Sequence, residues 1–199
     1  MARKKSAKKT HKKSSTKASR KAVQKRVSKP AKKAPRKGKK VDPIPKGVHT
    51  VTPSLTFQDS AFALAFYEKA FGAKELFRLT EPGGKVGHAE MRIGDSLIMM
   101  ADEYPEMALL SAKTLNGTPM RLSLAVKNPD ALMERAVAAG ATVMRPMQQE
   151  FYGWRAGVVT DPFGYSWTIT CQVEELSPKQ LQDRWAKMLA ASKTEGSAA

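Results

Sequence analysis

Two segments of this chain repeat each other without a gap. The first, SLTFQDSAFALAFYEKAFGA, begins at Ser54, and the second, LSLAVKNPDALMERAVAAGA, begins 68 residues later at Leu122. Each reads as a strand, a capping residue, a helix and a terminal Gly-Ala pair. An internal repeat of this kind predicts two modules of the same fold that pair their sheets.

Capping residues in both segments predict where the helices begin and end. Asp59 or Ser60 starts the first helix, and Asn128 caps the second. Gly72 and Gly140 end them, because glycine adopts the left-handed conformation at little cost.

Three strand-like runs follow each Gly-Ala pair, with short turns between them. Each module is therefore predicted to be βαβββ. The expected strands are 74–79, 86–93, 96–101, 142–147, 156–160 and 166–171.

A third helix is predicted near the C-terminus, in the stretch SPKQLQDRWAKMLAA. Ser177 with Gln180 three residues later forms a capping box. The apolar face of this helix should dock on the body of the protein or on a second subunit.

The first 40 residues have a different composition from the rest. They hold 15 Lys and 4 Arg, with no Asp, Glu or aromatic residue. Such a segment cannot bury enough apolar surface to order itself, so we expect it to be disordered when free. Residues 2–40 resemble the Lys/Ala/Pro tails of linker histones. Nonspecific nucleic-acid binding is the favoured interpretation; an anionic membrane surface and a solvated tail without a dedicated partner are the alternatives.

The remaining residues are nearly neutral, with 16 basic and 18 acidic side chains. They contain no apolar run long enough to span a membrane and no secretory signal. The single cysteine, Cys171, excludes an intrachain disulfide and suits a reducing compartment. The expected location is cytoplasmic, or nucleoid-associated if the tail holds DNA.

These patterns predict three parts. Residues 1–43 form the tail, residues 44–176 form a domain with modules at about 48–103 and 118–173, and residues 177–199 form a helix with a frayed end.

Four phrases of the body resemble one family. They are IPKGVHTVTPSL, FYEKAFGAKELFRL, GKVGHAEMRIGDSLIMMADE and FYGWRAGVVTDPFGYSW. Their order and spacing resemble the vicinal oxygen chelate superfamily (the glyoxalase/bleomycin-resistance/dioxygenase fold), and within it the PhnB-like branch. The resemblance implies an α+β fold in which two βαβββ modules form an open mixed β-barrel around a ligand cavity. Members include metal-dependent isomerases, dioxygenases and thiol transferases, and also metal-free drug-binding proteins, so it leaves open whether this chain is an enzyme.

The resemblance also implies where metal ligands would stand. The four positions, on the first and last strands of each module, fall at Thr52, Ile98, Met120 and Thr168. None is a ligand that divalent transition metals use in such sites. We therefore predict no cofactor, with a divalent metal as the alternative.

Strand alternation predicts which residues face the cavity. The expected ligand-binding set from the strands is Thr52, Arg92, Met100, Met120 and Thr168. His88 and Glu90 share the polar face of one strand with Arg92, and they are the candidate catalytic pair. A structural ion pair and a displaced metal site are the alternatives for these two.

The loop QQEFYGWRAG supplies the remaining candidates. Tyr152, Trp154 and Arg155 combine aromatic rings with a cation and could close over a planar or anionic ligand. Aromatic packing between modules or subunits is the alternative.

The combined prediction is a homodimeric protein that binds a small amphiphilic molecule in a metal-free barrel and is tethered to nucleic acid by its tail. The first alternative is a metal-dependent or His88/Glu90-assisted lyase, isomerase or dioxygenase. The second is a nucleoid-associated protein that uses the barrel only to dimerise.

Overall fold

The computed structural model describes residues 41–196, with side chains through residue 191. The predictions of a disordered tail and of its nucleic-acid contacts lie outside the described residues. The described residues from Asp42 onward belong to one compact unit. Within that part of the chain, no helix has the length and apolar character needed to cross a bilayer.

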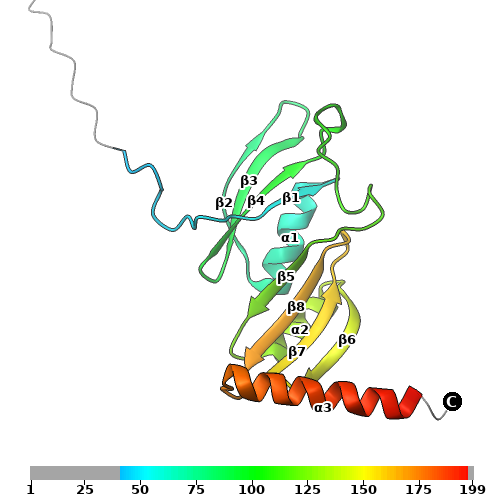
Figure 1. Ribbon diagram of the computed structural model, residues 1–199. Coiled ribbons are helices and arrows are strands. Elements are labelled where there is room, and N and C mark those ends of the chain that lie inside the picture. The colour runs from blue at the N-terminus through cyan, green and yellow to red at the C-terminus, as the bar shows by residue number, and fades with distance from the viewer. Residues whose placement is uncertain (1–40, 197–199) are drawn as a thin grey trace, which may run out of the picture. The chain divides into compact units, whose positions relative to one another are not determined.

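Both predicted modules are present, each with one helix and four strands (Figure 1). The first comprises β1 (Ser54–Phe57), α1 (Ser60–Phe71), β2 (Lys74–Thr80), β3 (Val86–Ile93) and β4 (Ser96–Asp102). The second comprises β5 (Arg121–Ala125), α2 (Pro129–Ala138), β6 (Thr142–Gln149), β7 (Trp154–Thr160) and β8 (Ser166–Gln172). A 3-10 turn, η1 (Pro105–Met107), lies between the modules, and α3 (Pro178–Gly196) follows them. The α+β class and the two βαβββ modules are confirmed.

The predicted caps account for the ends of α1 and α2. The Asp59 carboxylate accepts a hydrogen bond from the Phe62 backbone N–H at 2.8 Å. The Asn128 side-chain oxygen accepts one from the Ala131 N–H at 3.2 Å. Gly72 ends α1 with φ of 69°, a left-handed conformation that favours glycine.

Each module forms its own four-stranded mixed sheet. The strand orders are β1-β4-β3-β2 and β5-β8-β7-β6, and the first pair in each order is parallel while the others are antiparallel. α1 packs on the first sheet and α2 on the second. We call the side that packs against the helix the helix face and the other side the open face. The sheets do not close, which fits the expected open barrel.

The helix caps correct the offset of the repeat. Asp59 caps α1 and Asn128 caps α2, so equivalent positions from the first strand through the cap are 69 residues apart, and Ser54 paired with Met99 corresponds to Ser123 paired with Thr168. The gapless alignment used 68, which matches Gly72 to Gly140. A one-residue slip in a strand moves every side chain to the opposite face, and this affects several site predictions below.

Hydrogen bonds from the turn before β8 join the two modules. Asp161 is buried, and its Oδ2 accepts hydrogen bonds from the Tyr67 hydroxyl of α1 at 2.6 Å and from the Trp167 indole at 2.8 Å. The Tyr165 hydroxyl donates to the Thr56 carbonyl at 2.9 Å. The second module is therefore fixed to both α1 and β1 of the first.

The predicted capping box begins α3, since the Ser177 backbone N–H donates to the Gln180 side-chain oxygen at 2.8 Å. Arg184 of α3 binds both carboxylate oxygens of Glu174, at 2.7 and 2.6 Å. The Trp185 ring packs on Phe151, with 5.4 Å between ring centres. The N-terminal half of α3 is thus attached to the body.

Candidate functional site

The open face of the first sheet carries the predicted catalytic pair. His88, Glu90 and Arg92 are half-buried and alternate with buried residues of the helix face, as the pleat requires. His88 Nε2 lies 3.5 Å from Glu90 Oε1, and the two side chains are 35% and 20% exposed. Strand alternation thus placed both side chains on one accessible face.

Arg92 points away from this pair. Its guanidinium donates to the Asp95 carbonyl at 3.1 Å and to the Gly47 carbonyl at 3.4 Å. The side chain therefore ties the β3–β4 turn to the segment before β1.

The open face of the second sheet carries a cavity of about 660 Å³. It contains two residues of the predicted ligand-binding set, Tyr152 and Thr168. The residues that line it are Thr118, Arg121, Met144, Arg145, Tyr152, Val158, Thr160, Ser166 and Thr168. We take this cavity as the candidate functional site.

Two arginines of this cavity were absent from the sequence prediction. Arg121 pairs with Ser166 across the parallel β5–β8 ladder, and Arg145 pairs with Val158 on β7. In the sequence, the alternation of Arg121 and Ser123 with two leucines was a usable signal for the open face. Arg145 gave no such signal, because β6 has shifts in register that disturb its alternation.

The two arginines differ in their partners. Arg145 Nη1 lies 2.5 Å from a Glu150 carboxylate oxygen, but the Arg145 Nε is buried without a hydrogen-bond partner. Arg121 is exposed and makes no ion pair within residues 41–191. The cavity therefore holds more positive charge than the one nearby carboxylate balances.

The predictions for β4 are corrected by its register. Met100 pairs with Ala89 and Ile98 pairs with Met91, so both lie on the helix face, and Met100 is fully buried. Met99 takes the open-face position. The expectation that Met100 lines the cavity is therefore wrong, and its cause is a one-residue slip in counting from the turn.

Met120 is also displaced from its predicted position. It precedes β5 and is exposed, and the neighbouring Arg121 is the residue that lines the cavity. Thr52 precedes β1, and its hydroxyl donates to the His49 carbonyl at 3.3 Å. Thr52 lines a smaller cavity of about 270 Å³, whose wall includes Trp167 of the second module.

Tyr152, Trp154 and Arg155 do not line one common cavity. This corrects the prediction that the three side chains close together over a single ligand. Tyr152 lines the cavity on the second sheet, whereas Trp154 lines a hollow beside Gln172. Arg155 donates two hydrogen bonds to the Asp130 carboxylate of α2, at 2.8 and 2.5 Å. This pairing lowers the pKa of Asp130 from its ordinary value.

Strand pairing also gives the residues nearest to the predicted metal positions. On the open faces the parallel pairs are Ser54 with Met99 and Ser123 with Thr168. Within the described part of the chain, no group of three or more His, Cys, Asp or Glu side chains is placed to hold a metal ion. Hydroxyl and thioether groups of this kind are weak ligands for divalent transition metals.

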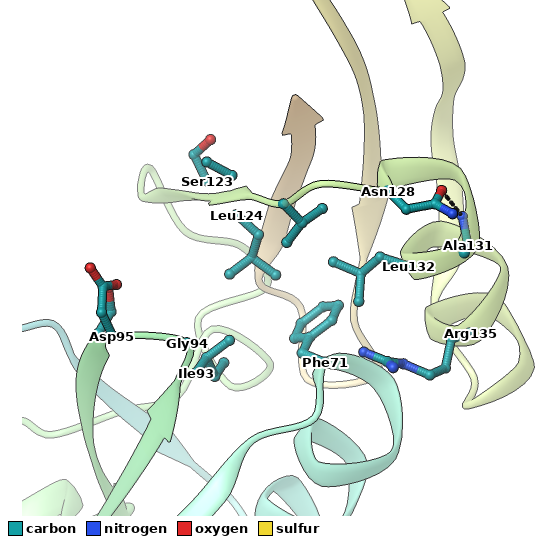
Figure 2. Close-up of a pocket in the computed structure, with 13 residues that line it drawn as sticks. Phe71, Ile93, Gly94, Asp95, Ser123, Leu124, Asn128, Ala131, Leu132 and Arg135 are labelled. Atoms are coloured by element: carbon teal, nitrogen blue, oxygen red, sulfur yellow. Dashed lines mark hydrogen bonds between the residues drawn. The ribbon is translucent and has the colours of Figure 1, made fainter. Parts of the chain in front are cut away.

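A second large cavity, of about 570 Å³, opens beside the edge of β5 (Figure 2). Figure 2 shows Phe71, Leu124 and Leu132 grouped near its centre, with Asp95 and Arg135 on opposite sides. Arg135 Nε already donates to the Ala70 carbonyl at 2.8 Å. Because its charged groups do not converge, we rank this cavity below the one on the second sheet.

Comparison with known proteins identifies the family. The sequence model of the Glyoxalase/Bleomycin resistance protein/Dioxygenase superfamily matches residues 47–169. The chain belongs to this superfamily. The match spans both βαβββ modules up to β8, so the glyoxalase-type fold and the repeat describe the same part of the molecule.

The chain is also similar to a sequence relative and to two solved structures. An uncharacterized protein of Mycobacterium bovis is 39% identical over 135 residues, which cover 66% of this chain and 89% of the relative. A solved gene product of Arabidopsis thaliana is 28% identical, with a TM-score of 0.51 over 62% of this chain and 98% of the other. A glyoxalase-related enzyme from Fulvimarina pelagi is 26% identical, with a TM-score of 0.51 over 62% and 88%. The assignment to the PhnB-like branch stays a prediction.

Proposed function

We propose that this glyoxalase-superfamily protein binds a small amphiphilic molecule on its open sheet faces without using a metal. The observation that carries this proposal is the cavity on the second sheet, where hydroxyl groups, arginines, a tyrosine and apolar side chains line one space. Ligand sites commonly combine an apolar wall with a few polar groups that fix orientation.

A thermal-shift screen of metabolites and drugs against the full chain tests binding. Compounds that raise the melting temperature should lose their effect in Tyr152→Ala and Thr168→Val, because both side chains line the cavity. Thr80→Val, on the exposed edge strand of the other sheet, is the matched control. Hits that survive both cavity variants would overturn this location.

The metal-free part of the proposal rests on the side chains at the paired open-face positions, Ser54, Met99, Ser123 and Thr168. Metal analysis of purified protein should find less than one divalent ion per chain. A stoichiometric ion that His88→Ala removes would contradict the proposal and would favour a displaced metal site on β3.

An enzymatic function is the second candidate, and the His88–Glu90 pair favours it. A carboxylate beside an imidazole can orient the ring and balance its charge, as general acid–base catalysis requires. Both side chains are partly exposed, so a substrate could reach them from the open face. Substrate turnover that His88→Gln abolishes, while binding persists, would establish this candidate.

We further propose that residues 2–40 hold the protein on nucleic acid. The support is their charge, 15 Lys and 4 Arg without an acidic residue. Phosphate neutralisation of this kind weakens steeply as salt rises. DNA binding should therefore fall with salt and disappear when residues 1–40 are removed. If the shortened chain keeps its affinity, the tail is not the tether.

A further inference from the structure

We propose that the cavity on the second sheet takes an organic anion, and that Arg121 and Arg145 bind its phosphate, phosphonate or carboxylate group. This inference rests on the function proposed above and names the chemical class of the ligand. It would assign a role to two residues that the sequence prediction did not include.

The charge of the cavity is the first argument. Arg121 and Arg145 line it, and no acidic residue does. Glu150 balances part of the charge on Arg145, whereas Arg121 has no ion-pair partner among the described residues. An oxyanion is the ligand group that this excess of guanidinium groups favours, because both its charge and its planar or tetrahedral oxygens suit guanidinium donors.

The buried Nε of Arg145 is the second argument. This N–H donor has no partner in the protein, and burying an unsatisfied donor is unfavourable. Its guanidinium already uses Nη1 on Glu150 at 2.5 Å. An anion in the cavity would supply the acceptor that the protein lacks.

Neutral donors around the arginines are the third argument. The hydroxyl groups of Tyr152, Thr160, Ser166 and Thr168 line the same cavity. No hydrogen bond from these hydroxyls to another residue is found between residues 41 and 191. Free hydroxyl donors beside guanidinium groups match the several oxygens of a phosphate or a carboxylate.

Comparison of the two modules shows that this polarity is particular to the second. Phe77 pairs with Glu90 on the first sheet where Arg145 pairs with Val158 on the second, and Met99 stands where Thr168 stands. The equivalent surface of the first module therefore has an aromatic ring, a carboxylate and a thioether, and its arginine, Arg92, already donates to the Gly47 and Asp95 carbonyls. An anion is expected on the second sheet alone.

The test is a site-resolved titration of the full chain, followed by the backbone amide signals in NMR. Inorganic phosphate and acetate are added separately at constant ionic strength. We expect saturable shifts at Thr160, Ser166 and Thr168 with at least one of the two anions. Tighter binding of phosphate would point to a phosphate or phosphonate ligand, and tighter binding of acetate to a carboxylate.

Variants decide whether the arginines bind the anion. Arg121→Gln should weaken binding about tenfold or more, the effect of losing one charge-assisted hydrogen bond, and Arg145→Gln should do the same. Arg78→Gln is the control, because Arg78 pairs with Glu75 on the first sheet. Shifts confined to residues 1–40, or unchanged affinity in Arg121→Gln, would overturn the inference. If neutral compounds bind the cavity and both anions do not, the proposed function stands and this inference fails.

Discussion

At the scale of single residues, Asp161 carries the most interactions of any buried carboxylate described. It accepts hydrogen bonds from the Tyr67 hydroxyl, the Trp167 indole and the backbone N–H groups of Phe163 and Tyr165. Burial raises its pKa above the ordinary value, although the four donated hydrogen bonds oppose that shift. One carboxylate thus organises its own turn and binds α1 of the other module.

Replacement of this carboxylate should be strongly destabilising. Asp161→Asn places an N–H₂ donor against groups that are themselves donors, so at least one donor loses its hydrogen bond. We expect the free energy of unfolding to fall by about 3 kcal/mol. Urea unfolding measures the change. Asp183→Asn is the control: its exposed pair with Lys179 on α3 should be worth within about 0.5 kcal/mol. A change below about 1 kcal/mol in Asp161→Asn would show that the network is dispensable.

Gly153, in the turn before β7, is a second residue with a specific requirement. Its φ is +81°, and an added Cβ would lie 2.6 Å from the Glu174 carbonyl oxygen. Gly94 also has a positive φ, +59°, but its Cβ would meet nothing within 4 Å. Gly94→Ala should therefore lower the free energy of unfolding only by the cost of a left-handed backbone at alanine, about 1–2 kcal/mol. Gly153→Ala should lower the free energy of unfolding by about 2 kcal/mol more, because the new Cβ forces the backbone at Glu174 to move. Equal losses in chemical denaturation would contradict the steric argument.

At the scale of elements, the Arg184–Glu174 ion pair attaches α3 together with the Trp185–Phe151 ring contact. The Arg184 guanidinium lowers the pKa of Glu174 from its ordinary value. A lowered pKa means that the pair contributes above the ordinary value and is lost as the pH falls through the folded-state pKa. The attachment of α3 should therefore weaken as the pH falls, before the body unfolds.

The fluorescence of Trp185 measures this weakening, because its ring packs on Phe151. The signal is the difference between the wild-type chain and Trp185→Phe. We expect the fluorescence to change with acid in the wild type, and the acid-form signal to be present already at neutral pH in Glu174→Gln. Glu75→Gln removes the comparable pair with Arg78 on β2 and should leave the Trp185 signal unchanged. If Glu174→Gln behaves like this control, the pair does not hold α3.

At the scale of the whole molecule, exposed apolar side chains on β2 favour the proposed homodimer. β2 is an edge strand, and its Leu76, Phe77 and Leu79 side chains are exposed. Open edges with apolar side chains tend to associate. Light scattering should give twice the chain mass, and the double variant Phe77→Glu/Leu79→Glu should give the monomer mass. Val137→Glu, on an exposed position of α2, is the control. A wild-type chain that is monomeric would contradict the dimer.

Local signals were sufficient for the elements. Asp59, Asn128, Ser177 and the helix-ending Gly72 each act on their own backbone within a few residues, so the order of helices and strands follows from short stretches of sequence. The alternation of His88, Glu90 and Arg92 likewise needed only the pleat of one strand.

The cavity required the register between strands, which no local stretch contains. Whether Met99 or Met100 lies on the open face of the first sheet depends on how β4 pairs with β3, and a shift of one residue reverses the answer. The same holds for Met120 and Arg121. The position of Arg145 depends on the shifts in register between β6 and β7. Arg155 lies apart from Tyr152 because it pairs with Asp130 of α2. Both depend on tertiary structure.

The sequence by itself determined two βαβββ modules, a C-terminal helix and a basic N-terminal segment, because caps, turns, periodicity and charge act over a few residues. Only the tertiary structure decided which side chains share the cavity. Arg121, Arg145, Tyr152 and Thr168 come from four places in the second module, and hydrogen bonding between strands brings them to one surface. Convergence of this kind is set by long-range pairing, where one residue of register decides which face a side chain occupies.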